Sequence, residues 1–407
     1  MVVYCGIDWA EHHHDVAIVD AVGVVLAKRR ITDDVAGFTA LSELLCAHAE
    51  SPAMVDVGLE TDRGLLVVAL RSAGYRVFAI NPKAVDRYRD RYAVSGAKSD
   101  AADALVLANL LRTDRDRHRP IPDDSDQVTA IAVLARAHQD AVRTLLRDTN
   151  RLRAVLREFF PAAVAAFPNL STKSALTVLA AAPTPTAAGQ LSSDQIHDLL
   201  LSTGRIAVRT GEVERLHEAF AAEQLHQPAP VEQAMGQAVR SIVTTVQATK
   251  TAIGDLETAL AARFDSHPDA EILRSLPGLG VVLGGRVLGE FGDDPTRFTH
   301  AASRRCFAGT APITRASGKS RVVLLRRARN QRLADACRWW AFNSLLHSPG
   351  ALAYYRQRRQ AGDTHEAALR RLGSKLVGQL HHCLQHRELY REDIAWDTTP
   401  PKQSTAA

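Results

Sequence analysis

The sequence predicts an α/β domain in the first part of the chain and mostly α-helical structure in the rest. Three observations predict this arrangement. Short apolar runs separated by turn residues fill positions 2–81, apolar residues recur at helical spacing over 126–165, and another long helical pattern follows the sequence QPAP at 227–230. With 407 residues, the chain has room for two or three domains.

The first part predicts strands and helices in a defined order. Three consecutive strands, VVYCGID (2–8), DVAIVDA (15–21) and VVLAKRRI (24–31), are followed by a helix over 34–49, a strand MVDVGLE (54–60), a helix over 63–74 and a strand YRVFAIN (75–81). Gly74 closes the second helix and Pro82 stops the last strand. With the helix that starts at KSDAADA, the order is βββαβαβα, which is typical of the ribonuclease-H-like fold.

The long helical pattern after QPAP carries a heptad repeat. Its apolar positions advance in alternate steps of four and three residues: Met235, Val239, Ile242, Val246, Thr249, Ile253, Leu256 and Leu260. Such a seam either packs against its own domain or pairs with a second copy in a coiled coil. Both interpretations stay open at this point.

The last part of the chain predicts a helix–hairpin–helix over 273–293, whose PGLG turn would offer backbone N–H groups to a phosphate. A basic, mostly helical region is expected over 295–387. The residues 393–407 are expected to form a disordered tail.

Composition excludes several classes of protein. Hydrophobic residues make up 46% and charged residues 23%, which excludes global disorder. No apolar run reaches the length of a membrane span, and the amino-terminal residues do not resemble a signal peptide, so we expect a cytoplasmic protein. The five cysteines never occur in CxxC spacing and predict neither disulfides nor a zinc site.

Positive charge is concentrated near the carboxyl end. The formal net charge is only +5, but positions 301–360 hold twelve arginines and one lysine against a single acid, Asp335. A block of one sign at this density is typical of phosphate binding, and the excess of arginine favours bidentate phosphate contacts.

Four carboxylates stand at positions that suit metal binding. Asp8 ends the first strand, Glu60 ends the fourth, and Asp100 and Asp103 are three apart at the start of a helix. In a ribonuclease-H-like sheet the first and fourth strands are neighbours, so these acids would converge, and converging carboxylates need cations between them. Mg²⁺ prefers such oxygen ligands, and two ions would suit phosphoryl transfer. Asp56 lies on the same strand face as Glu60, so strand parity alone does not separate the two.

These acids and several segments near the carboxyl end resemble the motifs of a known family. GIDWA, VGLE and SDAADA resemble the DEDD box of the IS110 insertion-sequence transposases. The segments LRSLPGLG, FAGTAPITRASGKS and RRARNQRLADACRWWAFNSLLHSPGALAYYRQRRQAG resemble that family's second conserved domain. The resemblance covers most of the chain, except that 167–235 matches no motif.

The resemblance implies a mechanism and partners. A RuvC-like domain over 1–115 would hold Mg²⁺, two ions per active site, on Asp8, Glu60, Asp100 and Asp103. Ser317, in a transposase domain over 266–392, would attack the phosphodiester and form a phosphoserine link to DNA. The partners would be donor and target DNA, a noncoding bridge RNA, and further copies of the chain in a dimer or tetramer joined through a coiled-coil region at 116–265. The acids and the serine of one active site would come from different subunits, and the protein would act at the bacterial nucleoid.

Without the resemblance, Ser317 is an ordinary turn residue, with Ser320 and Ser303 as neighbours of the same kind. Trp339 and Trp340 are expected in the core. The residues expected to contact nucleic acid are Arg87, Arg89, Arg91, Arg304, Arg305, Arg315, Lys319, Arg321, Arg326, Arg327, Arg329 and Arg332. Two alternatives stay open: a Holliday-junction endonuclease that uses metal-activated water, and a non-catalytic DNA-binding protein.

Overall fold

The computed structural model describes residues 2–90, 100–318 and 320–396, with the side chains of residues 100 and 101 left out. The chain divides into two compact units, Met1–Asp123 and Asp124–Ala407. The first unit extends beyond the predicted boundary at 115. It includes the 3₁₀ turn η2 (Arg115–Arg117), and the N–H of Ile121 donates to Val77 O at 2.7 Å. Over the described ranges, no helix has the length and apolar content needed to cross a membrane.

The first unit is built on a five-stranded mixed sheet in the order β3-β2-β1-β4-β5. The strands are β1 (Val3–Trp9), β2 (His13–Val19), β3 (Val25–Thr32), β4 (Val55–Leu59) and β5 (Arg76–Ala79). The first three are antiparallel to one another, whereas β4 runs parallel to β1 and β5 parallel to β4. All five strands were predicted, and the predicted contact of the first strand with the fourth is confirmed.

Helices cover both faces of this sheet. Val3, Cys5 and Ile7 of β1 point into a core that also holds α1 (Val35–Cys46) and α2 (Leu65–Ser72). The other face packs on α4 (Asp100–Asp114), beside α3 (Pro82–Asp90). The connection between α1 and β4 contains the short 3₁₀ turn η1 (Pro52–Met54).

The face of the sheet that packs on α4 has two features that were not predicted. Helix α3 was not predicted; Pro82 ends the strand segment and also begins the helix, because its fixed φ suits the first helical turn and it needs no N–H partner there. The contact between α4 and β1 is very close, since a Cβ on Gly6 would lie 2.0 Å from Ala104 O.

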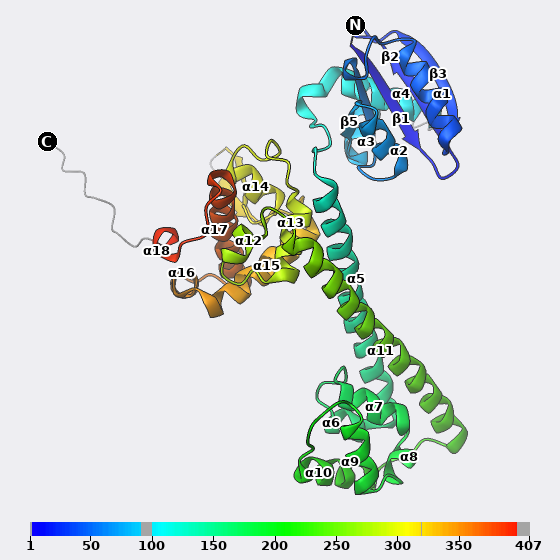
Figure 1. Ribbon diagram of the computed structural model, residues 1–407, viewed down its shortest axis with the longest axis vertical. Coiled ribbons are helices and arrows are strands. Elements are labelled where there is room, and N and C mark those ends of the chain that lie inside the picture. The colour runs from blue at the N-terminus through cyan, green and yellow to red at the C-terminus, as the bar shows by residue number, and fades with distance from the viewer. Residues whose placement is uncertain (1, 91–99, 319, 397–407) are drawn as a thin grey trace, which may run out of the picture. The chain divides into compact units, whose positions relative to one another are not determined.

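Two long helices organise the second unit, α5 (Asp126–Phe159) and α11 (Ala229–Asp265), and Figure 1 shows them side by side. They run antiparallel, because the start of α5 shares a core with the end of α11 and the end of α5 shares another core with the first half of α11. The second of these cores is completed by five short helices: α6 (Pro161–Ala166), α7 (Lys173–Ala181), α8 (Pro185–Gly189), α9 (Ser193–Leu201) and α10 (Thr210–Ala221).

The heptad seam of α11 packs against α5 of the same chain. Val239, Ile242, Val246 and Leu260 are buried there, and Ile253 lies half-buried between the two cores. Packing within the chain's own domain is therefore confirmed, whereas pairing with a second copy stays a prediction.

The other core of the second unit holds the carboxyl-terminal helices. They are α12 (Ala270–Ser275), α13 (Val281–Phe291), α14 (Ala301–Phe307), α15 (Gln331–His347), α16 (Pro349–Gln360) and α17 (His365–His386). The predicted PGLG turn joins α12 to α13. Its first two residues pack against α15, Gly280 is exposed, and phosphate binding by the turn stays a prediction. Trp340 Nε1 donates to Pro277 O at 2.9 Å, and a Cβ on Gly278 would lie 2.6 Å from Ser344 N.

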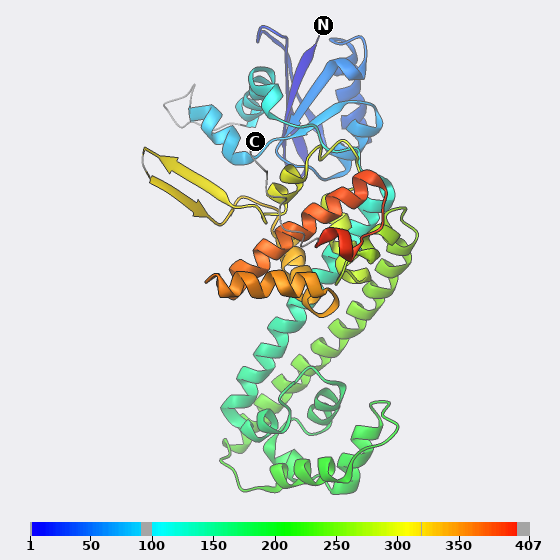
Figure 2. The same ribbon diagram turned by 90° about the vertical axis from the view of Figure 1, so that its left-hand side faces the viewer.

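Two parts of this region differ from expectation. A two-stranded hairpin, β6 (Ile313–Ser317) and β7 (Ser320–Leu324), interrupts the region expected to be mostly helical, and Figure 2 shows it projecting from the helices of its unit. The expected disorder from 393 is also wrong for its first residues. Helix α18 (Glu392–Ala395) is formed, and the indole N–H of Trp396 donates to Tyr390 Oη at 2.7 Å. Residues 397–407 lie outside the described ranges.

Candidate functional site

Asp8 and Glu60 come from adjacent parallel strands and follow paired residues. Ile7 of β1 pairs with Leu59 of β4, so the next residue of each strand is one of these two acids. Asp8 is half-buried and Glu60 is exposed. The register therefore brings two of the four predicted carboxylates to neighbouring positions at the carboxyl ends of two parallel strands.

Asp56, which strand parity could not separate from Glu60, has a structural role. Its side chain is fully buried, and Arg115 Nε donates to its Oδ2 at 2.7 Å. Arg76 Nε forms an ion pair with its Oδ1, also at 2.7 Å. Two guanidinium groups thus compensate this buried charge, and Asp56 is committed to holding β5 and η2 against β4.

The other two predicted acids lie at the start of α4. Asp103 is 4% exposed, and Arg89 of α3 donates to its Oδ1 at 2.6 Å. Arg89 also pairs with Asp86. Burial would lower the pKa of Arg89, but the two carboxylates outweigh burial, so its pKa is raised. Asp100 is the first residue of the helix, but its side chain lies outside the described part of the structure.

The described side chains do not by themselves complete a metal cage. Within the described ranges, no three Asp, Glu, His or Cys side chains lie close enough together to hold a metal ion. Asp103 faces a guanidinium, which supplies the positive charge that a buried carboxylate needs. The donor set nevertheless has the chemistry that Mg²⁺ prefers, since every predicted ligand is a carboxylate oxygen.

Ser317 lies at the tip of the β6–β7 hairpin. It is exposed and pairs with Ser320, so the two serines face each other across the turn. Gly318, which follows, has φ +55, a conformation that glycine adopts without strain. Lys319, expected to contact nucleic acid, lies outside the described residues. The hairpin therefore presents a hydroxyl to solvent at the end of a projecting ribbon.

The predicted nucleic-acid-binding arginines differ in accessibility. The exposed ones are Arg87, Arg315, Arg321 and Arg327, and the half-buried ones are Arg89, Arg305, Arg326, Arg329 and Arg332. Arg332 donates to both carboxylate oxygens of Asp140 at 2.9 and 2.8 Å. Arg91 lies outside the described residues.

The prediction that Arg304 contacts nucleic acid is corrected by its burial. Its side chain is buried, with the guanidinium 5.0 Å from the ring centroids of both Phe291 and Phe298. Burial lowers its pKa to about 10. Arg304 belongs to the core of the second unit and is not available to nucleic acid.

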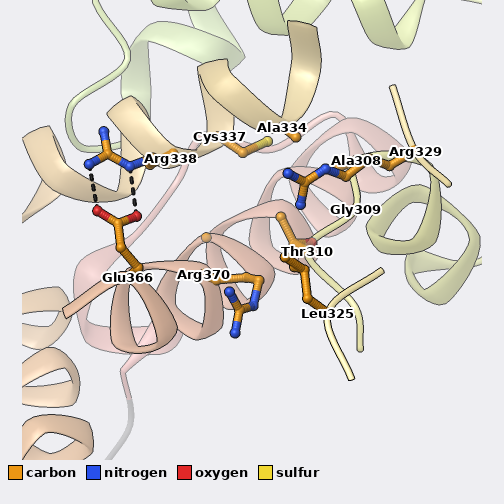
Figure 3. Close-up of a pocket in the computed structure, with 11 residues that line it drawn as sticks. Ala308, Gly309, Thr310, Leu325, Arg329, Ala334, Cys337, Arg338, Glu366 and Arg370 are labelled. Atoms are coloured by element: carbon orange, nitrogen blue, oxygen red, sulfur yellow. Dashed lines mark hydrogen bonds and ion pairs between the residues drawn. The ribbon is translucent and has the colours of Figure 1, made fainter. Parts of the chain in front are cut away.

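A cavity of about 220 Å³ lies where the hairpin joins the helices. Its wall includes Gly309 before the hairpin, Leu325 after it, and side chains of α15 and α17 (Figure 3). Three guanidinium groups line it, those of Arg329, Arg338 and Arg370. Neither Arg338 nor Arg370 was among the predicted nucleic-acid-binding residues. Arg338 lies within the recognised segment that begins at Arg326 but was counted there only as part of the basic block, and Arg370 lies in no recognised motif.

Comparison with known proteins identifies the family. Residues 5–161 match a family model for a DEDD transposase of the IS110 type, and residues 270–356 match the transposase IS116/IS110/IS902 family. The chain is 50% identical to the mini-circle transposase assigned to IS117 in Streptomyces coelicolor, over 97% of both chains. It belongs to the IS110/IS116/IS902 family of transposases.

More distant relatives of this transposase also match along almost the whole chain. A 44.8 kDa protein of insertion element IS116 from Streptomyces clavuligerus is 29% identical over 99% of this chain and 98% of its own. A 42 kDa protein of insertion element IS900 from Mycobacterium paratuberculosis is 27% identical over 95% and 97%. The two family models of the transposase include every predicted catalytic residue, since the acids fall within 5–161 and Ser317 within 270–356.

Proposed function

We propose that this transposase cuts and rejoins DNA through a covalent phosphoserine link at Ser317, with Mg²⁺ bound by Asp8, Glu60, Asp100 and Asp103. The observation that carries the proposal is the register that sets Asp8 beside Glu60. The strand order β3-β2-β1-β4-β5, with α4 packed on β1, supports a RuvC-like interpretation of the first unit.

Each acid would have a distinct part in holding the metal. Asp8 and Glu60 would supply the ligands from the sheet, and Asp100 and Asp103 those from the start of α4. When bound, Mg²⁺ would polarise the phosphoryl group and stabilise the leaving oxygen. Asp103 would exchange its ion pair with Arg89 for the metal, and until then Arg89 would hold this carboxylate in position.

Ser317 would act as the nucleophile. Its Oγ forms a bond to phosphorus while the bond from phosphorus to the 3′ oxygen breaks; the serine proton passes to solvent, and the freed 3′ oxygen takes up a proton. The new phosphodiester keeps the energy of the old one, so a second 3′ hydroxyl can displace the serine and reseal the strand without ATP. Arg315, exposed on the same strand, is suited to balance charge on the phosphoryl oxygens.

We propose further that the acids and the serine of one active site come from different copies in a dimer or tetramer. A bridge RNA would pair with donor and target DNA, so that base pairing, not protein side chains, would specify the sequence.

A reconstituted reaction tests these proposals. Protein is incubated with RNA transcribed from the DNA that flanks the gene, Mg²⁺, and donor and target DNA, and the joined products are sequenced. We expect a protein–DNA adduct that survives denaturing electrophoresis and maps to Ser317. Ser317→Ala should abolish the adduct and the joining, whereas the matched control Ser320→Ala, on the opposite strand of the hairpin, should retain both.

Three outcomes would contradict parts of the proposal. Strand cutting by Ser317→Ala would favour an endonuclease that uses metal-activated water. Strand exchange unaffected by Asp8→Ala would favour a DNA-binding protein without metal chemistry. For the shared active site, a mixture of Asp8→Ala and Ser317→Ala proteins should regain joining, and a mixture as inactive as either variant alone would show that both groups must lie in one chain.

A further inference from the structure

Four aromatic rings form a surface cluster on the carboxyl-terminal helices. Trp339 and Phe342 of α15 are 43% and 41% exposed, and their ring centroids lie 6.0 Å apart in an edge-to-face arrangement. His365 of α17 contacts both Phe342 and Tyr355 of α16 through further edge-to-face pairs. Trp339 was expected in the core. That prediction is wrong, because α15 turns Trp340 inward, where it is fully buried, and leaves its neighbour at the surface.

The aromatic cluster adjoins the arginine-lined cavity. The Arg338 guanidinium lies 5.2 Å from the Trp339 ring centroid, and Arg338 is also part of the cavity wall. Glu366, next in sequence to His365, receives two hydrogen bonds from Arg338 at 2.6 and 2.7 Å (Figure 3). Arg338 therefore lies between the aromatic rings and the cavity, and Glu366 balances its positive charge.

The wall of the cavity carries more positive than negative charge, with three arginines and one glutamate among the described residues. Within the described part of the chain, neither Arg329 nor Arg370 forms an ion pair with a carboxylate, and Glu366 is the single acid in the wall. Burial lowers the pKa of Arg370, and repulsion by Arg329 and Arg371 lowers it further. Asp363 and Glu366 oppose this repulsion without cancelling it. An anion in the cavity would relieve this repulsion, and the space is sufficient for a phosphate group.

We propose that this surface binds an unpaired nucleotide, with the base stacked on Trp339 and the phosphate held by Arg329 and Arg370. Exposed aromatic rings beside arginines are the arrangement that single-stranded nucleic acids recognise, because every base has a π-face and every linkage a negative charge. A duplex hides its bases and cannot use the platform. The inference rests on the proposed function only in taking nucleic acid as the ligand; it uses neither the serine nor the metal.

Charge argues against a second copy of this chain as the occupant. A protein partner would have to bring carboxylates to the cavity, and the segment 301–360 of a second copy would bring a single acid. Asp335, the only acid between 301 and 360, accepts a hydrogen bond from Gln139 Nε2 of α5 at 2.8 Å.

Binding to the full-length protein tests the proposal. The probes are fluorescently labelled single strands of roughly 12 nucleotides, as RNA and as DNA, and the duplex of the same sequence. We expect Trp339→Ala to weaken single-strand binding by roughly tenfold and to leave duplex binding unchanged. Trp339→Phe should recover most of the loss. Leu346→Ala is the matched control, since Leu346 is an 80% exposed apolar residue on the same helix.

An abasic strand separates the two halves of the site. Arg370→Ala should weaken binding of the normal and the abasic strand alike, because it acts on phosphate. Trp339→Ala should lose its effect on the abasic strand, because no base remains to stack. The stronger of the RNA and DNA arms identifies which nucleic acid the surface takes.

Two results would overturn the proposal. One is single-strand affinity of Trp339→Ala equal to that of the unmodified protein; the other is a change of oligomeric state in Trp339→Ala on size-exclusion chromatography, which would make the cluster a protein interface. Ser317→Ala and Asp8→Ala should bind single strands normally. Failure of the proposed DNA chemistry is thereby distinguished from failure of this site.

Discussion

Arg89 holds Asp103 by a hydrogen bond of 2.6 Å between Nη2 and Oδ1, and this carboxylate is one of the four proposed to bind Mg²⁺. The side chain of Asp103 is 6% exposed and that of Arg89 20%. A buried carboxylate without a positive partner is strongly unfavourable. Arg89 and a bound Mg²⁺ would therefore compete for the carboxylate of Asp103.

Replacing Arg89 should make the first unit depend on Mg²⁺. Arg89→Gln removes the guanidinium that donates to the buried Asp103 and should lower the free energy of unfolding by about 3 kcal/mol. Millimolar Mg²⁺ should recover part of this loss, so the rise in Tm on adding Mg²⁺ should be larger for the variant than for the unmodified protein. Asp86→Asn, which removes the exposed partner of Arg89, is the control. An equal Mg²⁺ response in Arg89→Gln and the unmodified protein would show that Asp103 does not bind the metal.

The two acids on the same face of β4 should separate into a structural and a functional residue. Asp56→Asn removes a charge that Arg76 and Arg115 both contact, and it should lower stability by about 3 kcal/mol. Glu60→Gln, at the exposed strand end, should cost less stability and abolish strand cutting. Thermal melts and the cutting assay on both variants measure the difference. Full cutting activity in Glu60→Gln would remove it from the metal site.

Gly6→Ala should push α4 away from the sheet. A Cβ at this position would lie 2.0 Å from Ala104 O and 2.5 Å from Ala108 N, both backbone atoms that cannot rotate aside. We expect a loss of about 3 kcal/mol in stability and of strand cutting, because α4 carries two of the four acids. Gly254→Ala on α11 is the opposite case, since no atom lies within 4 Å of the added methyl group. There the better helix propensity of alanine should raise stability by about 0.5–1 kcal/mol. A Tm for Gly6→Ala equal to that of the unmodified protein would contradict the close contact.

Glu290 should make the second unit sensitive to acid. Burial would raise the pKa of Glu290, but hydrogen bonds from Arg136 and Asn330 outweigh burial and lower it. Because the folded pKa lies below the unfolded value, the stabilisation is fully present above a pH of about 4.3 and is lost as the pH falls toward the folded pKa. Urea midpoints of the unmodified protein should therefore drop more steeply between about pH 6 and about pH 3.5 than those of Glu290→Gln. The pKa of Glu366 is also lowered, chiefly by its hydrogen bond from Arg338, but this pair is exposed, so Glu366→Gln should change the pH profile much less. Parallel pH profiles for Glu290→Gln and the unmodified protein would contradict this role.

The sheet was predictable because its strands carry their own turn signals. Each apolar run ends at a glycine, proline or charged residue, and the order of strands and helices was sufficient to place the first strand beside the fourth. The register then follows, and with it the neighbouring positions of Asp8 and Glu60. The distinction between Asp56 and Glu60 was not predictable, because Arg76 and Arg115 reach Asp56 from segments 20 and 59 residues away in sequence.

The hairpin and the exposed tryptophan were missed for different reasons. The Ser-Gly turn at 317–318 was recognised. The β-branched residues of ITRAS and SRVVL are a usable strand signal, but they were included in a region expected to be mostly helical. Adjacent tryptophans on a helix point about 100° apart, so Trp339 and Trp340 could not both face one core. Which of the two is buried depends on Pro277, whose carbonyl receives the hydrogen bond of Trp340.

The antiparallel pair α5 and α11 brings together the two ends of the segment that connects them. The chain leaves α5 at Phe159 and returns at Ala229, and the two points are neighbours, since Gln227 Nε2 donates to Glu158 O at 3.3 Å. Residues 160–228 therefore form an insertion whose two ends lie side by side. A replacement segment that keeps the buried contacts of α6 to α10 with α5 and α11 would leave the path of the remaining chain unchanged. This is therefore where evolution, or an engineer, can fit a new module without disturbing either set of predicted catalytic groups.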